Sequence, residues 1–393
     1  MRIQPFLLII FLLPSLWGCG NGDDGTELRA TLISAGGFHT CAASGDSAVC
    51  WGENSDGQLG NGGRLDSPFP VTVGGLSAPV EVSSGRAHTC ALLPDGTVRC
   101  WGRNAFGQLG NATVASSTTP IEVSGLIGAA STSAGNSHTC AVLSDGTVAC
   151  WGNNEFGQLG NGSFAHSASP IAVTGLTGAT AVSAGGTHTC ALVSGGEVRC
   201  WGSSLFDQLG NAGIPTGSGS LSPVEVTGLS NAVSLSAGES HTCALLGDGS
   251  IRCWGDNSSG QLGSFWPAPD LISSSTPVSP GLSGAVSVAA GLSHSCAALS
   301  NKRVFCWGEN ADGQLGNGSF AGFVPPGSGA PPTTTINPVP AAGIATATSV
   351  TAGFFHSCAG LDDGRIACWG RNTSGQLGDG TDFSSPVPVL VIE

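Results

Sequence analysis

Residues 133–162 read SAGNSHTCAVLSDGTVACWGNNEFGQLGNG, and SPIAVTGL follows at 169–176. This pattern recurs seven times along the 393 residues. Each copy has an Ala-Gly or Ser-Gly before His-[Thr/Ser]-Cys, then a Cys-Trp-Gly and a Gln-Leu-Gly. The first cysteines of successive copies are 49, 50, 50, 53, 53 and 62 residues apart. A period of about 50 residues is typical of propeller blades.

Each copy contains four short β-prone segments: one ends at the Ala-Gly, one starts at the His, one runs into Cys-Trp, and one contains Pro-x-x-Val. The segments are apolar on both faces, as expected for a sheet that lies between two others. Closing the row of copies into a ring removes its two exposed apolar ends. We therefore predict an all-β fold over residues 30–393, a seven-bladed β-propeller with four short antiparallel strands per blade.

The order of segments at the two ends of the chain suggests how the ring closes. The chain ends at SPVPVLVIE (385–393), a seventh Pro-x-x-Val segment, whereas the first copy starts at LRATLISAG (28–36) with no such segment before it. We expect each Pro-x-x-Val strand to belong to the following blade. The C-terminal strand would then complete the first blade.

The motifs Cys-Trp-Gly-x-Asn-x-x-Gly-Gln-Leu-Gly-Asn-Gly and Ala-Gly-x-x-His-[Thr/Ser] are similar to the repeat of the regulator of chromosome condensation family, over about residues 30–392. The resemblance implies a seven-bladed propeller. It implies no single activity, because the family's functions include guanine nucleotide exchange on a small nuclear GTPase, chromatin contact, light sensing and inhibition of secreted β-lactamases.

Fourteen of the fifteen cysteines form two-cysteine sets, one in each copy. A three-residue turn at 94–96 places Cys90 directly opposite Cys100, at a separation that a disulfide can bridge. In the first copy, one residue shorter, a two-residue turn at 45–46 keeps the same opposition. We predict seven hairpin disulfides: Cys41–Cys50, Cys90–Cys100, Cys140–Cys150, Cys190–Cys200, Cys243–Cys253, Cys296–Cys306 and Cys358–Cys368.

Two expectations follow from this pairing. Lys302 occupies the place of the turn glycine in the sixth copy, so that turn should be the most strained. Because every bridge lies within one hairpin, the bridges should contribute little to ring closure or blade docking. The alternative, a zinc site built from His-x-Cys and the second cysteine, lacks closely spaced Cys-x-x-Cys knuckles, and an oxidising compartment favours disulfides. We predict no metal and no cofactor.

The N-terminus has the features of an export signal. Residues 1–18 combine Arg2 with a short apolar run that is too short to span a bilayer comfortably. Leu-Trp-Gly-Cys at 16–19 resembles a bacterial lipobox, which implies lipidation of Cys19, a lipidated tether over 19–29 and location at the outer membrane or cell surface. Lipidation would also explain the unpaired fifteenth cysteine. Trp17 departs from the small residue that is usual there, which leaves open the alternative of cleavage and release as a secreted protein.

Charge and motif content disfavour two classes of function. The formal net charge is −14, Lys302 is the only lysine, and no basic stripe is available for nucleic acid. The histidines of the repeat recur in all copies, so we interpret them as scaffold residues that bond backbone, and the repeated tryptophans as blade packing. His166, outside the repeat, has no assignable catalytic partner. Phosphate-binding, GxSxG and metalloprotease motifs are absent, so we predict that the chain is not an enzyme.

The departures from the repeat are the candidate recognition sites. Two insertions, after Gly263 and after Gly316, would emerge on the same face of the ring as the Gly-to-His turns. They carry the aromatic candidates Phe265, Trp266, Phe320 and Phe323. We expect a monomeric, exported scaffold whose loops bind a protein or a carbohydrate. The alternatives are that these aromatics only cap the blade rim, or that the propeller is an exported enzyme inhibitor or enzyme. Nucleotide exchange is disfavoured, because an exported protein would not meet the small nuclear GTPase.

Overall fold

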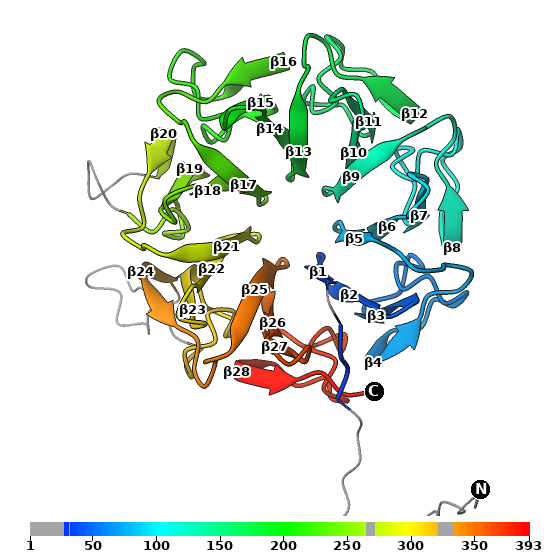
Figure 1. Cartoon of the computed structure of the whole chain (residues 1–393), viewed down its shortest axis with the longest axis vertical. Coiled ribbons are helices and arrows are strands. Elements are labelled where there is room, and N and C mark those ends of the chain that lie inside the picture. Colours follow the sequence, from blue (N-terminus) through cyan, green and yellow to red (C-terminus); the bar gives the residue numbers. More distant parts are fainter. Residues whose placement is uncertain (1–26, 31, 265–271, 321–333) are drawn as a thin grey trace, which may run out of the picture.

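A computed structural model describes residues 27–30, 32–264, 272–320 and 334–393. The predicted all-β, seven-bladed propeller is confirmed: seven four-stranded antiparallel sheets surround a central axis (Figure 1). In each sheet the strands run from the axis to the rim in sequence order. Within the described ranges, no helix is long and apolar enough to cross a membrane.

The strands follow the repeat. The innermost strands, which end at the Ala-Gly or Ser-Gly, are β1 (Leu32–Ala35), β5 (Glu81–Ser84), β9 (Ala129–Ala134), β13 (Ala179–Ala184), β17 (Ala232–Ala237), β21 (Ala285–Ala290) and β25 (Ala347–Ala352). The second strands, which start at the His, are β2 (His39–Ser44), β6 (His88–Leu92), β10 (His138–Leu143), β14 (His188–Val193), β18 (His241–Leu246), β22 (His294–Leu299) and β26 (His356–Leu361).

The outer half of each blade comes from the second half of the copy. The third strands, which carry Cys-Trp, are β3 (Ser47–Gly52), β7 (Val98–Gly102), β11 (Val148–Gly152), β15 (Glu197–Ser204), β19 (Ile251–Asp256), β23 (Val304–Glu309) and β27 (Ile366–Gly370). The rim strands are β4 (Ser67–Thr72), β8 (Ser117–Glu122), β12 (Ser167–Ala172), β16 (Ser218–Glu225), β20 (Ser273–Val278), β24 (Thr334–Pro340) and β28 (Ser385–Leu390).

The expected ring closure is wrong. The last rim strand, β28, pairs with β27 of its own blade, with Cys368 opposite Val389, and every blade is one continuous stretch of chain. The loop after Gln-Leu-Gly returns the chain to the rim of the same blade. A periodic pattern gives the order of strands but not the point at which one blade ends, so the repeat could not decide between the two assignments.

An N-terminal segment at residues 27–30 joins the last blade to the first instead. Leu28 N–H donates to the Val391 carbonyl at 3.2 Å, and Ala30 N–H donates to the Gly364 carbonyl at 2.9 Å. The Leu28 side chain is buried in a cluster that includes Trp51 of the first blade. We call residues 27–30 the strut; it packs on both blades directly before the first copy of the repeat, next to the predicted start of the propeller at residue 30.

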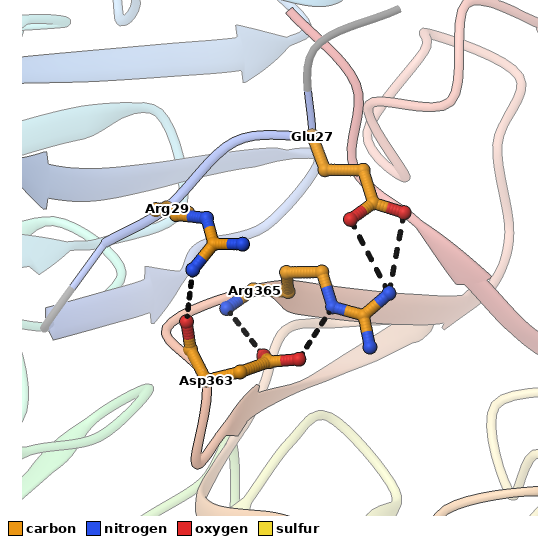
Figure 2. A network of polar contacts seen from close by, with 4 residues as sticks. All are labelled: Glu27, Arg29, Asp363 and Arg365. Atoms are coloured by element: carbon orange, nitrogen blue, oxygen red, sulfur yellow. Dashed lines mark hydrogen bonds and ion pairs between the residues drawn. The ribbon is translucent and has the colours of Figure 1, made fainter. Parts of the chain in front are cut away.

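Charged side chains at the surface also connect residues 27–30 to the last blade (Figure 2). Arg365 of the last blade contacts both carboxylate oxygens of Glu27 at 3.2 Å, and its Nε donates to Asp363 at 2.7 Å. Arg29 donates to the Asp363 carbonyl at 2.9 Å. These groups are exposed, so they define the geometry of the seam more than they stabilise it.

Neighbouring blades are joined by a hydrogen-bond motif made from the repeat residues. His39 Nε2 lies 2.8 Å from the Thr89 hydroxyl of the next blade, that hydroxyl donates to the Gln58 carbonyl at 3.0 Å, and Trp101 Nε1 donates to the same carbonyl at 2.9 Å. The hydroxyl hydrogen is thereby used, so the imidazole donates through Nε2. The expectation of a bond to backbone is wrong. The other pairs are His88–Thr139, His138–Thr189, His188–Thr242, His241–Ser295, His294–Ser357 and His356–Thr40.

The cysteine pairs lie in the seams between blades. The predicted register is confirmed: Cys90 lies opposite Cys100, with Cα atoms 4.1 Å apart, and all seven pairs are bonded. Each bridge packs against the indole of the next blade, as the Cys90–Cys100 bridge does against Trp151. The bridges therefore contribute to blade docking, contrary to expectation, because their sulfur atoms point out of the sheet toward the neighbour.

The unusual turn in the sixth blade is present. Lys302 has φ +65°, whereas the equivalent residue of the second blade is Gly96 at φ +79°. A lysine in this left-handed region is strained, as the sequence predicted. Its ammonium group contacts Asp362 of the last blade at 2.5 Å.

Candidate functional site

One face of the ring carries both the turns between Gly and His and the long loops that follow Trp-Gly. In the first blade His39 pairs with Gly52, which places the turn at 36–38 beside the start of the loop at 53–66. The same pairing recurs in every blade. We call the surface formed by these two segments and their six equivalents the loop face. The predicted co-location of turns and loops is confirmed.

Three positions per blade on the loop face vary, while the residues around them are fixed by the inter-blade bonds. The first position lines the axis and holds Gly37, Arg86, Asn136, Gly186, Glu239, Leu292 and Phe354. The second precedes the His and holds Phe38, Ala87, Ser137, Thr187, Ser240, Ser293 and Phe355. The third follows Trp-Gly and holds Glu53, Arg103, Asn153, Ser203, Asp256, Glu309 and Arg371.

The first and last blades contribute an aromatic cluster to the loop face. The ring centroids of Phe38 and Phe354 are 5.9 Å apart, those of Phe38 and Phe355 are 5.8 Å apart, and those of Phe354 and Phe355 are 6.3 Å apart. All three side chains are half-buried. Two adjacent blades thus present one apolar surface beside the axis.

Two arginines lie over this cluster. The Arg371 guanidinium is 5.7 Å from the centroid of Phe38 and 5.2 Å from that of Phe355, and Arg86 is 6.0 Å from that of Phe354. Among the described residues, neither guanidinium lies within 4.0 Å of a carboxylate. A stacked arginine keeps its edge donors available for a partner.

Acidic side chains also lie on the loop face, in the first, fifth and sixth blades. Glu239 accepts a hydrogen bond from Asn136 Nδ2 at 2.6 Å, and burial raises the pKa of its carboxyl group. Burial also raises the pKa of Glu53 and of Glu309. The loop face is therefore chemically asymmetric although its backbone repeats.

A further buried carboxyl group lies between two inner strands. Thr132 N–H lies 3.1 and 3.3 Å from the two carboxylate oxygens of Glu81, and desolvation raises the pKa of Glu81 to about 7. At an adjacent contact of this seam, Ala134 N–H donates to the Ser83 hydroxyl at 2.9 Å. Glu81 therefore satisfies the free edge of the neighbouring inner strand, which is a structural role.

Of the four aromatic candidates, the structure describes one. Phe320 is 48% exposed, in the loop of the sixth blade. Phe265, Trp266 and Phe323 lie outside the described residues, as does Cys19. The Phe cluster beside the axis was missed, although the two variable residues between Gly and His in every copy were a visible signal.

A second apolar area that the sequence analysis missed lies farther out on the loop face. Phe164 and Phe156 of the third blade are 61% and 42% exposed, and with Leu221 of the fourth blade they line a shallow hollow. Phe206 is 41% exposed on the fourth blade. The loop face therefore offers aromatic contacts at its rim as well as at its axis.

Other departures from the repeat have structural roles. Asp207, at φ +64°, accepts hydrogen bonds from Thr216 and from Ser273 of the next blade, both at 2.6 Å. His166 Nδ1 accepts the Asn154 N–H at 2.9 Å. Each residue fixes a loop, and neither is arranged as a nucleophile or a base.

Within the described part of the chain, no group of three or more His, Cys, Asp or Glu side chains is placed to hold a metal ion. The sulfur atoms next to the repeat histidines are in disulfides. The imidazoles are fully buried and hydrogen-bonded to hydroxyl groups. The repeat histidines therefore have no access to a substrate.

Comparison with known proteins places the repeat in a family. The regulator of chromosome condensation (RCC1) repeat matches seven segments, at residues 50–92, 95–142, 145–192, 195–245, 248–298, 301–359 and 363–393. A second description of the same repeat matches from residue 30 to residue 376, again in seven segments.

Individual relatives match a part of the chain. The Probable E3 ubiquitin-protein ligase HERC6 of Homo sapiens is 36% identical over 155 residues, which are 38% of this chain and 14% of that protein. The Secretion-regulating guanine nucleotide exchange factor of Mus musculus is 31% identical over 188 residues, 43% of this chain and 39% of that protein. The matched segments thus span less than half the length of these relatives. Prp20p of Saccharomyces cerevisiae has a similar fold, with a TM-score of 0.76 and 23% identity over 88% of this chain and 86% of that one.

Proposed function

The chain belongs to the regulator of chromosome condensation (RCC1) repeat family, and on that premise we propose that it is a non-enzymatic scaffold whose loop face binds another protein. The observation that supports this most is that the recurring residues and the variable residues of the repeat have different roles. His, Thr or Ser, Trp and Gln are used in the bonds between blades, whereas the residues that differ gather on the loop face.

The chemistry of that face suits a protein partner. Phenylalanine rings with stacked arginines combine residue types that are enriched at protein interfaces and frequent at their energetic centres. The cluster around Phe355 and Arg371 also sits on two docked blades, so binding would order few side chains. The yeast protein of similar fold is described with binding properties to Gsp1p and histones, which supports protein binding as a use of this fold.

The location that we propose is outside the cytoplasm, with the chain held to the outer membrane or cell surface through Cys19. The sequence at 1–19 supports export and lipidation, and the seven disulfides support an oxidising compartment. Replacing Cys19 by Ser tests the anchor, because the protein should then move from the membrane fraction to the soluble fraction. Identical fractionation of parent and variant would contradict it.

Binding is tested by capturing partners with the mature protein and then measuring affinity for the captured protein. The double variant Phe354→Ala, Phe355→Ala should bind more weakly by about 2 kcal/mol or more. The matched control is Ile127→Ala, because Ile127 is 85% exposed in the connection after β8, on the opposite face. Weaker binding by the control, with no change in the double variant, would place the interface on the other face.

A further inference from the structure

The carboxylate of Glu239 lies at the axis of the ring on the loop face, beside a cavity that we call the mouth. Glu239 occupies the turn of the fifth blade, where its N–H donates to the Gly291 carbonyl and its own carbonyl accepts from Gly186 N–H, both at 3.2 Å. The side chain extends back over the fourth blade and accepts from Asn136 Nδ2 of the third blade at 2.6 Å. The backbone of Glu239 is therefore bonded to the fourth and sixth blades, and its carboxylate is held by Asn136 of the third blade.

The space beside this carboxylate is small and has walls of backbone and small side chains. A cavity of about 80 Å³ at the axis is lined by the Ala-Gly or Ser-Gly pairs and by Arg86, Asn136, Glu239 and Phe354. The fourth blade has Gly186 there, and a Cβ at that position would lie 2.7 Å from Glu239 Cδ. The cavity has room for one extended side chain and no room for a folded element.

The Glu239 carboxylate lacks a cation at contact distance within the described part of the chain. Arg86 is near enough to lower the pKa of Glu239, but the effect of burial is larger, and the Arg86 head lies over Phe354 in an exposed position. A mostly buried carboxylate without an ion-pair partner is costly, and a cation brought to it recovers part of that cost.

We propose that this mouth receives a lysine or arginine side chain of the protein partner, with Glu239 as the acceptor for its charged group. The Phe354 ring, on the same cavity wall, contacts the aliphatic stem or the cationic head. The net charge of −14 attracts a basic partner surface. The inference rests on the proposed function, because it specifies what the partner inserts at the centre of the loop face.

The direct test uses small probes of the inserted side chain. N-acetyl-lysine amide and N-acetyl-arginine amide are titrated against the full mature protein by isothermal calorimetry and ligand-observed NMR, with N-acetyl-norleucine amide as the neutral counterpart. We expect saturable binding of the two cationic amides and none of norleucine amide. Glu239→Gln, which keeps an acceptor for Asn136, should bind the cationic amides at least about tenfold more weakly, or about 1.4 kcal/mol.

The matched control is Glu155→Gln, which removes the same charge from an exposed position at the rim of the loop face. It should bind like the parent. Equal losses in both variants would show that net charge alone attracts the probes, and equal binding by Glu239→Gln and the parent would show that another group binds them; either result overturns the proposal. If Glu239→Gln melts at a lower temperature, Glu239→Asp, which retracts the carboxylate and keeps its charge, replaces it with the same expectation.

Two further measurements are needed. One distinguishes a protein side chain from a free polyamine as the source of the cation, and the other distinguishes failure of this proposal from failure of the proposed loop-face interface. Tighter binding of putrescine than of lysine amide would assign the mouth to free polyamines and overturn the assignment to a protein side chain. Unchanged affinity of Glu239→Gln for the captured partner would also overturn it, while leaving the loop face as the interface if Phe354→Ala, Phe355→Ala still weakens binding. Failure of both variants to weaken the partner would remove the proposed interface itself.

Discussion

The imidazole Nε2 of His356 in the last blade lies 2.8 Å from the hydroxyl of Thr40 in the first. That hydroxyl also contacts the Gln376 carbonyl at 3.1 Å, to which Trp51 donates at 2.9 Å. The ring thus closes with the same histidine-to-hydroxyl contact that joins every other pair of neighbouring blades. The N-terminal strut at 27–30 adds to this seam but does not replace it.

Removing the Thr40 hydroxyl should destabilise the ring. In Thr40→Val the shape is kept, but His356 Nε2 is left buried without a partner, which costs about 1–3 kcal/mol. Chemical denaturation measures the free energy of unfolding. Thr139→Val, at the equivalent place between the second and third blades, should cost a similar amount. Unchanged stability in both variants would contradict the role of the motif.

The strut should stabilise the propeller through Leu28. Leu28 is 1% exposed, so Leu28→Ala should lower the free energy of unfolding by about 2–5 kcal/mol. Leu32→Ala is the control, because Leu32 is 41% exposed and its loss should cost no more than about 0.5 kcal/mol. Equal stabilities of the two variants would mean that the strut is not docked in solution.

Acid should weaken the fold through the repeat histidines. Desolvation lowers the pKa of His88 to about 4, and it is the largest cause that lowers the other six to about 3, from an ordinary value of 6.5. The unfolded chain therefore binds protons below pH 6.5 that the folded chain does not, so stability is present above pH 6.5 and declines as the pH falls toward 3–4. Denaturant midpoints at pH 7.5, 6 and 4.5 should fall in that order. A constant midpoint would contradict neutral buried imidazoles.

Glu81 should change the stability with pH in the direction opposite to the histidines. Its pKa is raised from 4.5 to about 7, so the folded state loses stability as the pH rises from 4.5 through 7. Glu81→Gln keeps the acceptor for Thr132 N–H and removes the charge. The variant should be more stable than the parent at pH 8, by at most about 3 kcal/mol, and equal to it at pH 4. A gain of the same size at both pH values would indicate a cause other than ionisation.

The sixth blade offers a stabilising substitution. Lys302→Gly removes the strain of a non-glycine residue at φ +65° and should raise the free energy of unfolding by about 1 kcal/mol. Lys302→Ala loses the exposed contact with Asp362 without relieving the strain, so it should not stabilise. If the alanine variant were the more stable of the two, the left-handed conformation would not be the source of strain.

The repeat predicted the local structure well because its signals are local. Turn length fixed the opposition of Cys90 and Cys100, and the lysine at 302 marked a strained turn. The assignment of each rim strand to the following blade was wrong, because a pattern repeated end to end does not show where one blade ends and the next begins. The strut at 27–30 and the bond from His356 to Thr40 also join residues far apart in the sequence, so no single copy contained them.

The candidate site was only partly predictable. The sequence identified the correct face, because strand alternation places the turns and the loops together. It did not identify the cluster of Phe38 and Phe355 or the hydrogen bond between Glu239 and Asn136, because each of these contacts joins residues of different blades. The aromatic cluster and Glu239 come from the two variable residues between Gly and His in each copy, and not from the long insertions.

Hydroxyl-radical footprinting of the captured complex tests most directly whether the loop face binds a protein. Hydroxyl radicals oxidise phenylalanine side chains readily, and Phe38, Phe354 and Phe355 lie on the loop face beside its axis. Oxidation of Ile127 measures the exposure of the opposite face. We predict that the partner protects the three phenylalanines from oxidation and leaves Ile127 as reactive as in the free protein. Protection of Ile127 with unchanged reactivity of the phenylalanines would show that the partner binds the opposite face and not the loop face.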